Sequence, residues 1–203
     1  MTTRQRLFIT TALSLALAPI CAFADAIPGK PAPAFETKDA KGKAHKLADY
    51  KGKWVVLEWF NKDCPYVKKH YGSGNMQKLQ KTYTDKGVVW LSVVSSAAGK
   101  QGHMKPDEAV KVASTNKAAS SAILLDESGV MGKAYGAKTT PHMFVINPEG
   151  SVVYAGAIDD NDSSSPDVIA KSKNYIASAL DASLAGKPVE TASAKPYGCS
   201  VKY

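Results

Sequence analysis

One segment organises the rest of the chain: Trp54-Val55-Val56-Leu57-Glu58-Trp59-Phe60-Asn61-Lys62-Asp63-Cys64-Pro65-Tyr66-Val67. Its first seven residues are apolar except for Glu58, and so dense a run favours a strand buried on both faces, as in a parallel sheet covered by helices. Pro65 follows a short polar turn, where proline is tolerated as the start of a helix. Cys64 would then face unpaired backbone N–H groups at the positive end of a helix dipole, which favour thiolate over thiol. The segment predicts a reactive cysteine at a strand-to-helix junction.

The first residues have the pattern of a secretory signal peptide. A region with two arginines precedes an apolar core at 7–17, and residues 22–24 form a small-residue cleavage site. We expect cleavage after Ala24 and export to the periplasm. The apolar core is too short to span a bilayer, so no stable membrane insertion is expected after cleavage. A lipoprotein modified at Cys21 is disfavoured, because Ile20 is large where a small residue is expected.

Removal of residues 1–24 changes the composition of the chain. The precursor has 26 lysines and arginines against 18 acidic residues, and both arginines lie in the removed segment. Proteins that bind nucleic acid favour clustered basic faces and arginine forks, so dispersed lysine predicts a solvated surface and no nucleic-acid partner. Of the three cysteines, only Cys64 and Cys199 remain. Two cysteines in an exported chain fit a disulfide, either reversible or structural.

The order of the predicted elements indicates an α/β fold. Strands are expected at 54–60, 88–94 and 122–125, alternating with helices at 64–85, from 106 onward and at 130–135. Turn signals predict hairpins around 39–43 and over 143–154, before a last helix at 166–184. The glycines at 72–74 predict a kink or a break in the first helix. We expect a central mixed sheet, with a parallel βαβ core and antiparallel hairpins, in a domain over 25–185 followed by a tail over 186–203.

At about residues 28–184 the sequence resembles the thioredoxin superfamily, specifically its periplasmic redoxin and peroxiredoxin-like (alkyl hydroperoxide reductase–thiol-specific antioxidant) group. Residues 54–67 are similar to the thioredoxin active-site segment. Residues 138–146 are similar to the loop in which a cis-proline precedes a strand and lies against the reactive sulfur. Residues 39–43 and 50–53 resemble the N-terminal hairpin lead-in of redoxins. The resemblance implies a thioredoxin-like fold with an N-terminal β-hairpin. It also implies a site around Cys64 that is shaped by Asn61, Pro65, Thr140, cis Pro141 and His142.

Two departures from the family pattern restrict the chemistry. Val67 occupies the second position of the Cys-x-x-Cys motif, so a local dithiol–disulfide cycle is impossible. A typical peroxiredoxin carries Thr or Ser three residues before its cysteine and a proline four before that, where this chain has Asn61 and Leu57. Its distant arginine has no counterpart in the mature chain. The sequence looks most like the group whose single active-site cysteine aligns with the first cysteine of the thioredoxin motif.

Glu58 lies six residues before Cys64, where thioredoxins carry a buried acid that helps to move protons. Burying an acid inside this strand is expensive without a purpose or a partner. We therefore interpret Glu58 as a catalytic proton carrier, with a structural pairing to a lysine such as Lys138 as the alternative. His142 follows Pro141 and either tunes the thiol or is a surface imidazole.

Other polar residues are interpreted as solvated surface. The acidic segment 159–162 is only superficially similar to a calcium-binding loop. The remaining histidines, which are scattered, are His45, His70 and His103.

The resemblance implies an exported thiol oxidoreductase with antioxidant activity. Cys64 would attack a peroxide or a disulfide, and Cys199 would resolve the product by forming a Cys64–Cys199 disulfide. No organic cofactor or metal is required, and the expected partners are the oxidised substrate and a periplasmic or membrane-tethered thiol reductase. Peroxide reduction is the leading activity.

Three alternatives remain open. The first is thiol–disulfide exchange without peroxidase activity. The second is a purely structural Cys64–Cys199 disulfide on a degenerate scaffold. The third is copper(I) binding by Cys64, His142 and Cys199, since thiolate and imidazole suit that ion.

Overall fold

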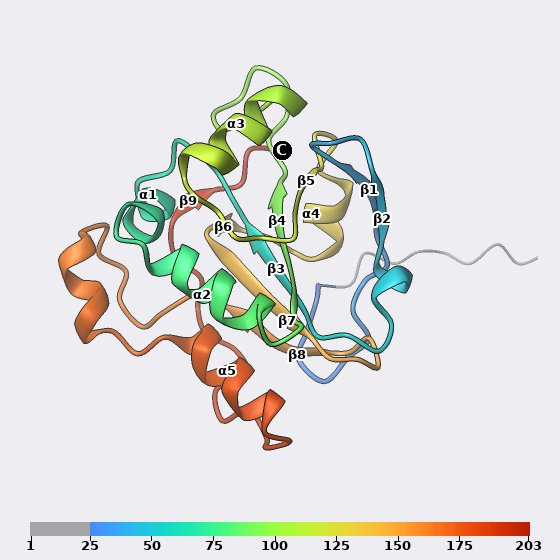
Figure 1. Cartoon of the computed structure of the whole chain (residues 1–203), viewed down its shortest axis with the longest axis vertical. Helices are drawn as coiled ribbons and strands as arrows, with labels where there is room; N and C mark the ends of the chain where they lie inside the picture. The colour runs from blue at the N-terminus through green and yellow to red at the C-terminus, as the bar shows by residue number, and fades with distance from the viewer. Residues whose placement is uncertain (1–24) are drawn as a thin grey trace, which may run out of the picture.

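Strand β3 (Val55–Trp59) lies at the centre of a seven-stranded mixed sheet (Figure 1). The structure is a computed structural model that describes residues 25–203, so the predicted signal peptide lies outside the described residues. The strand order is β2-β1-β5-β4-β3-β7-β8, in which β3, β4 and β5 are parallel and the other pairs are antiparallel. The remaining strands are β1 (Glu36–Asp39), β2 (Ala44–Lys46), β4 (Val89–Val94), β5 (Ala122–Leu125), β7 (His142–Ile146) and β8 (Val152–Gly156).

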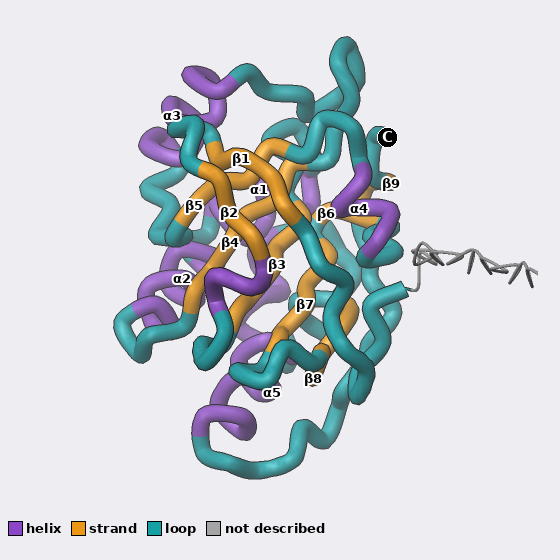
Figure 2. Tube along the Cα trace, turned by 90° about the vertical axis from the view of Figure 1, so that its right-hand side faces the viewer, coloured by secondary structure: helices purple, strands orange, loops and turns teal. Residues whose placement is uncertain are grey.

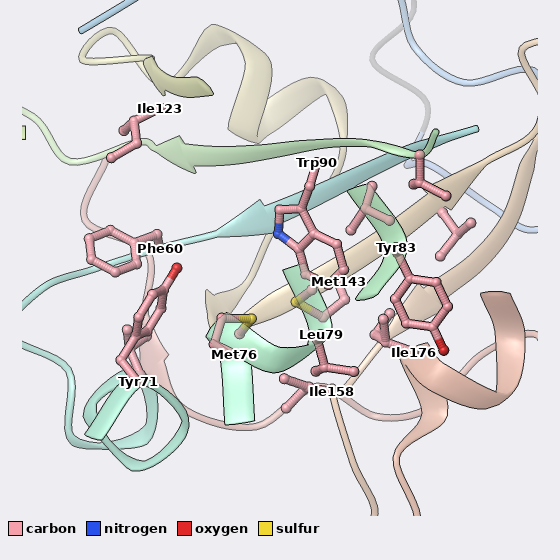
Figure 3. Close-up of a cluster of buried hydrophobic side chains, with 14 of the residues drawn as sticks. Phe60, Tyr71, Met76, Leu79, Tyr83, Trp90, Ile123, Met143, Ile158 and Ile176 are labelled. Carbon is pink, nitrogen blue, oxygen red and sulfur yellow. The ribbon is translucent and has the colours of Figure 1, made fainter. Parts of the chain in front are cut away.

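Every residue of β3 is buried because both faces of the sheet are covered. On one face, Val56 and Phe60 pack in the larger core against α1 (Pro65–Gly72), α2 (Asn75–Thr84), α3 (Pro106–Thr115) and α5 (Tyr175–Leu184). Figure 3 shows part of this core, in which Phe60 and Tyr71 meet edge to face. On the other face, Val55, Leu57 and Trp59 pack against α4 (Val130–Ala134) and the N-terminal segment. The expected mixed sheet covered by helices is confirmed.

The predicted break in the first helix is also confirmed. Helix α1 ends at Gly72, and α2 begins after Gly74, which has a positive φ of 78°. The N-terminal hairpin is formed by β1 and β2, and the second hairpin by β7 and β8. A short 3-10 helix, η1 (Leu47–Tyr50), links the first hairpin to β3.

The prediction of one continuous helix over 166–184 is wrong. The segment forms a 3-10 helix, η2 (Pro166–Lys171), and then α5. Ser172 is extended, with a ψ of 140°, and Asn174 caps α5 by accepting a hydrogen bond from the Ala177 amide. The amide of Lys173 donates to Asp160 instead of continuing the helix. No helix among residues 25–203 is long and apolar enough to cross a membrane.

The tail over 186–203 returns to the domain. Ser193 bridges to Ala155 at the sheet edge, and the chain then forms β9 (Cys199–Ser200). β9 pairs with β6 (Thr139–Thr140) in a separate antiparallel ladder, whose position relative to the main sheet is visible in Figure 2. This pairing carries Cys199 to the loop that precedes β7.

Candidate active site

Cys64 is the N-cap residue of α1, with extended backbone, and Pro65 is the first helical residue. The side chain has no exposed surface, and its Sγ donates a hydrogen bond of 3.0 Å to the carbonyl oxygen of Thr140. Strand β3 ends at Trp59 and α1 begins at Pro65, so the cysteine lies between the end of the strand and the start of the helix. The predicted strand-to-helix junction is therefore present.

The turn before Cys64 is held by Asn61. Its Oδ1 accepts a 2.9 Å hydrogen bond from the Asp63 amide, and its backbone carbonyl accepts from the Cys64 amide at 3.1 Å. Asn61 thus holds the turn with both its side-chain oxygen and its backbone carbonyl. The ammonium of Lys62 is held by Asp63 at 3.0 Å and Glu108 at 3.5 Å. Its charge is largely neutralised by these acids.

The loop opposite Cys64 contains a cis peptide bond between Thr140 and Pro141, as the resemblance implied. Thr140 also pairs with Cys199 in the β6–β9 ladder. At Gly198 the tail approaches this loop so closely that an added Cβ would lie 2.1 Å from the Thr140 carbonyl oxygen. Thr140 therefore contacts both cysteines, which are 135 positions apart in the sequence.

Both cysteines are free thiols, and each shifts the pKa of the other. Burial raises the pKa of Cys64, but hydrogen bonds from the Cys199 thiol, the Thr140 side chain and the Val67 amide outweigh burial and place this pKa below its ordinary value. The Val67 amide makes no cap hydrogen bond to the protonated thiol, so its effect concerns the thiolate. Burial and the neighbouring Cys64 raise the pKa of Cys199 to about 11. Cys64 is the more acidic thiol, and Cys199 the less acidic one.

Glu58 is fully buried beneath α1 and α2 and is surrounded by hydrogen-bond donors. Burial raises its pKa despite these donors. Their donor–acceptor distances are 2.8 Å from Tyr71, 3.0 Å from Gln80, 2.8 Å from Trp90 and 3.3 Å from Ser92. The alternative in which Glu58 pairs with Lys138 is wrong, because its partners are these neutral groups. Among residues 25–203, no hydrogen bond joins Glu58 directly to Cys64.

His142 lies on the opposite face of the sheet from Cys64. The centroid of its ring lies 4.5 Å from that of Phe144, which belongs to the smaller core. The next residue, Met143, packs instead in the larger core with Cys64. Burial and the charge of Lys138 lower the pKa of His142 to about 4. The interpretation as a surface imidazole is wrong because only 6% of the residue is exposed. Its position also removes the geometric basis for a copper site that combines His142 with the two thiols.

Several polar residues that were expected at the surface are buried. His45 bonds to Asp39 at 2.9 Å, and His70 is completely buried in α1. Asp159, from the segment interpreted as a solvated acidic loop, is 3% exposed. It accepts a 2.5 Å hydrogen bond from the hydroxyl of Tyr197, two residues before Cys199. No local sequence pattern indicates this contact, because it joins residues 38 positions apart with η2 and α5 between them.

The family model of the AhpC/TSA family matches residues 28–155. The chain belongs to this family. Its thioredoxin-superfamily assignment is further supported by the thiol-disulfide oxidoreductase ResA of Bacillus subtilis (strain 168), which is 30% identical over 75% of this chain and 86% of that protein.

Two solved structures extend the comparison. An uncharacterized conserved protein from Geobacillus kaustophilus has a TM-score of 0.76 and 31% identity, covering 88% of this chain and 93% of that one. A putative thiol:disulfide interchange protein DsbE from Chlorobium tepidum has a TM-score of 0.52 and 26% identity, covering 63% and 83%. The expected thioredoxin-like fold and redoxin family are confirmed.

This family member departs from the two-cysteine motif in a way that the structure explains. Val67 is 2% exposed and packs in the larger core, so its position in α1 supplies apolar contact and no second thiol. The other cysteine of the described residues, Cys199, lies in β9. The described residues contain no group of three or more His, Cys, Asp or Glu side chains placed to hold a metal ion.

Proposed function

We propose that this protein is a thiol–disulfide oxidoreductase in which Cys64 is the nucleophile and Cys199 the resolving thiol. One observation carries the proposal: Thr140 accepts the hydrogen bond of the Cys64 thiol at 3.0 Å and is also the ladder partner of Cys199. This shared neighbour supports a site in which the two thiols act together. We rank disulfide exchange above peroxide reduction as the activity, because relatives with this fold carry the names thiol-disulfide oxidoreductase and thiol:disulfide interchange protein.

The pKa values of the two thiols support these roles. A thiol below its ordinary pKa is more often a thiolate at neutral pH and is also the better leaving group. Cys64 therefore starts the reaction, because the pKa of Cys199 is raised to about 11 and this thiol remains protonated until a neighbour accepts its proton.

The exchange proceeds in two balanced steps. The Cys64 thiolate attacks one sulfur of a substrate disulfide, forms a mixed disulfide and releases the other substrate sulfur as a thiolate. Cys199, on losing its proton, then attacks the Cys64 sulfur, forms the Cys64–Cys199 disulfide and releases the second substrate thiolate. Two electrons pass from the two protein thiols to the substrate disulfide. An external dithiol reductase returns them by the reverse exchange.

Access to Cys64 requires the tail to move. Because Cys64 has no exposed surface when β9 is paired with β6, a substrate disulfide reaches the sulfur only after the tail separates from Thr140. The tail must return before Cys199 can resolve the mixed disulfide. We place the reaction in an exported compartment, on the signal-peptide pattern of residues 1–24.

Glu58 is assigned a supporting role in proton movement. Its raised pKa and its hydrogen bond to Tyr71 of α1 support this assignment. A carboxyl with a raised pKa exchanges protons nearer to neutral pH than an ordinary glutamate does.

Peroxide reduction is a second candidate, favoured by the family match. Its usual activating groups have no counterpart here, because Asn61 is engaged by the Asp63 amide and no arginine follows residue 6.

One experiment separates the two activities. The reduced protein is mixed with oxidised glutathione or with hydrogen peroxide, and the products are mapped by mass spectrometry. For disulfide exchange, glutathione disulfide should produce one intramolecular Cys64–Cys199 disulfide, and Cys199→Ser should accumulate a glutathione adduct on Cys64. Rapid oxidation by peroxide, with both thiols inert to the disulfide, would overturn the proposal in favour of peroxide reduction. Cys64→Ser is the control. It should form no glutathione adduct in the time in which Cys199→Ser forms one.

A further inference from the structure

A buried polar cluster connects the Cys199 tail to the helix that begins at Cys64. The hydroxyl of Tyr197 donates to Asp159 at 2.5 Å and lies 3.3 Å from the Lys69 ammonium and 3.2 Å from His70 Nε2. Lys69 also lies 3.4 Å from the Asp159 carboxylate. We call Lys69, His70, Asp159 and Tyr197 the tail latch.

The latch contains two charges that are removed from water. The side chains of Lys69 and Asp159 are 0% and 3% exposed. A buried ion pair is tolerated only when its remaining hydrogen-bonding groups are satisfied, and loss of one partner is strongly unfavourable. Lys69 donates its other hydrogen bond to the carbonyl of Asn161 at 2.8 Å. The hydroxyl of Tyr197 is the contribution of the tail to this set.

The ring of Tyr197 adds apolar contacts to the polar ones. Its centroid lies 5.7 Å from that of Tyr66, and the Lys69 ammonium lies 5.2 Å from its centroid. Tyr66 and Lys69 belong to α1, whose N-cap is Cys64, and Tyr197 precedes Cys199 by two residues. In Figure 1 the red C-terminal segment runs from α5 to β9 beside α1. The latch therefore connects the elements that carry the two thiols.

We propose that the tail latch is a positioning device that sets how often the tail is docked over Cys64. The inference rests on the proposed function, for which docking has two opposed consequences. A docked tail presents Cys199 to Cys64 but covers the Cys64 sulfur. A released tail exposes Cys64 but removes the resolving thiol.

Weakening the latch should therefore change two properties in opposite directions. Cys64 of the reduced protein should react faster with an external reagent. The Cys64–Cys199 disulfide should be easier to reduce, because the local concentration of Cys199 at Cys64 is lower. Simple loss of global stability would not produce this pair of changes under conditions where the protein remains folded.

The test uses Tyr197→Phe in the full chain, which removes the hydroxyl and keeps the ring. The rate at which iodoacetamide alkylates Cys64 is followed by peptide mass spectrometry, and the Cys64–Cys199 disulfide is equilibrated against glutathione. We expect at least a tenfold rise in the alkylation rate and a tenfold fall in the equilibrium constant for disulfide formation.

Tyr83→Phe is the matched control. Its hydroxyl is also engaged by a carboxylate, at 3.1 Å from Asp181, but it lies on α2 and contacts α5 instead of the tail. This variant should lose comparable thermal stability and retain the wild-type reactivity of Cys64. If Tyr197→Phe is destabilised like Tyr83→Phe but its Cys64 is alkylated at the wild-type rate, the latch proposal is wrong.

Two further outcomes are informative. If Tyr197→Phe does not fold, Asp159→Asn takes its place, because it keeps an acceptor for the Tyr197 hydroxyl and removes the charge. It should produce the same rise in alkylation rate and fall in disulfide stability, and the absence of these changes refutes the latch. Alkylation of Cys64 does not depend on any enzymatic activity. Faster alkylation in a protein that fails to reduce disulfides would support the latch and reject the proposed function.

Discussion

Replacing Gly198 with alanine tests whether the tail controls access to Cys64. Gly198 has a φ of +131°, a conformation that side-chain-bearing residues rarely adopt. Its position is also crowded, because a Cβ would lie 2.1 Å from the Thr140 carbonyl oxygen and 2.8 Å from its carbonyl carbon. Both atoms are backbone and belong to the loop that also accepts the hydrogen bond from the Cys64 thiol. Gly198→Ala therefore opposes the docked position of the tail directly.

The expected effect can be worked from this geometry. A non-glycine residue in such a backbone region costs about 1–3 kcal/mol. Real Cβ contacts essentially never fall below 3.0 Å, so the tail must also move by about 1 Å. If about 2 kcal/mol of this opposes docking, the population of released tail rises about 30-fold, since 1.4 kcal/mol corresponds to a factor of about ten.

The assay is alkylation of Cys64 by iodoacetamide in a Cys199→Ser background, where Cys64 is the one remaining thiol among the described residues 25–203. We expect the rate to rise about 30-fold in Gly198→Ala, in proportion to the released tail. Gly186→Ala is the matched control, because Gly186 also has a positive φ, of +68°, but nothing lies within 4 Å of its added Cβ. Equal rates in the two variants would refute the idea that close packing at Gly198 holds the tail over the sulfur.

Three other predictions address the site and its surroundings. Because the pKa of His142 is lowered to about 4 in the folded protein, its imidazole is neutral at pH 7. The contribution of His142 to stability is present above the pKa of the unfolded state, near 6.5, and is lost as the pH falls from there toward the folded-state pKa. Between pH 7 and pH 5, unfolding free energies from urea titration should fall by about 2 kcal/mol more in the wild type than in His142→Asn, and equal slopes would contradict this. Because burial raises the pKa of Glu58, the contribution of this residue to stability is lost as the pH rises through its folded-state pKa. The stability advantage of the wild type over Glu58→Gln should accordingly shrink with increasing pH, and a constant difference in thermal melts would argue that Glu58 does not titrate there. Finally, Val67→Cys combined with Cys199→Ser should allow a local disulfide to Cys64, detectable by mass spectrometry, whereas two persistent thiols under oxidising conditions would show that the buried helix position prevents it.

Much of the fold could be predicted from the sequence because its signals are local. The apolar run of β3 predicts a strand covered on both faces, and the glycines after α1 predict its end. Hydrophobic periodicity and turn residues report on neighbours within a few positions. The predicted helix over 166–184 is wrong for the same reason. Its break at Ser172 depends on the contact of Lys173 with Asp160, which no local pattern indicates.

The candidate site could be predicted only in part. The position of Cys64 at the start of α1 and the cis Pro141 follow from motifs that resemble a known family. The position of His142 does not follow from its place after Pro141, because the alternation of β7 sends its side chain to the opposite face. Apparent surface residues such as His70 and Asp159 are buried, and both contact the hydroxyl of Tyr197 in the tail.

The position of Cys64 at the start of a helix can therefore be predicted from the neighbouring residues alone. A strand, a polar turn and a proline are enough to place a thiol at a helix N-terminus, because each depends on backbone preferences of adjacent residues. The partner of that thiol depends on tertiary structure. Val67 stands where a local cysteine would be. Cys199 lies beside Thr140, which also contacts Cys64, because the tail pairs with Thr140, approaches it closely at Gly198 and holds Tyr197 against Lys69 and Asp159. These contacts join segments that are distant in the sequence, so no periodicity or spacing in the chain indicates them.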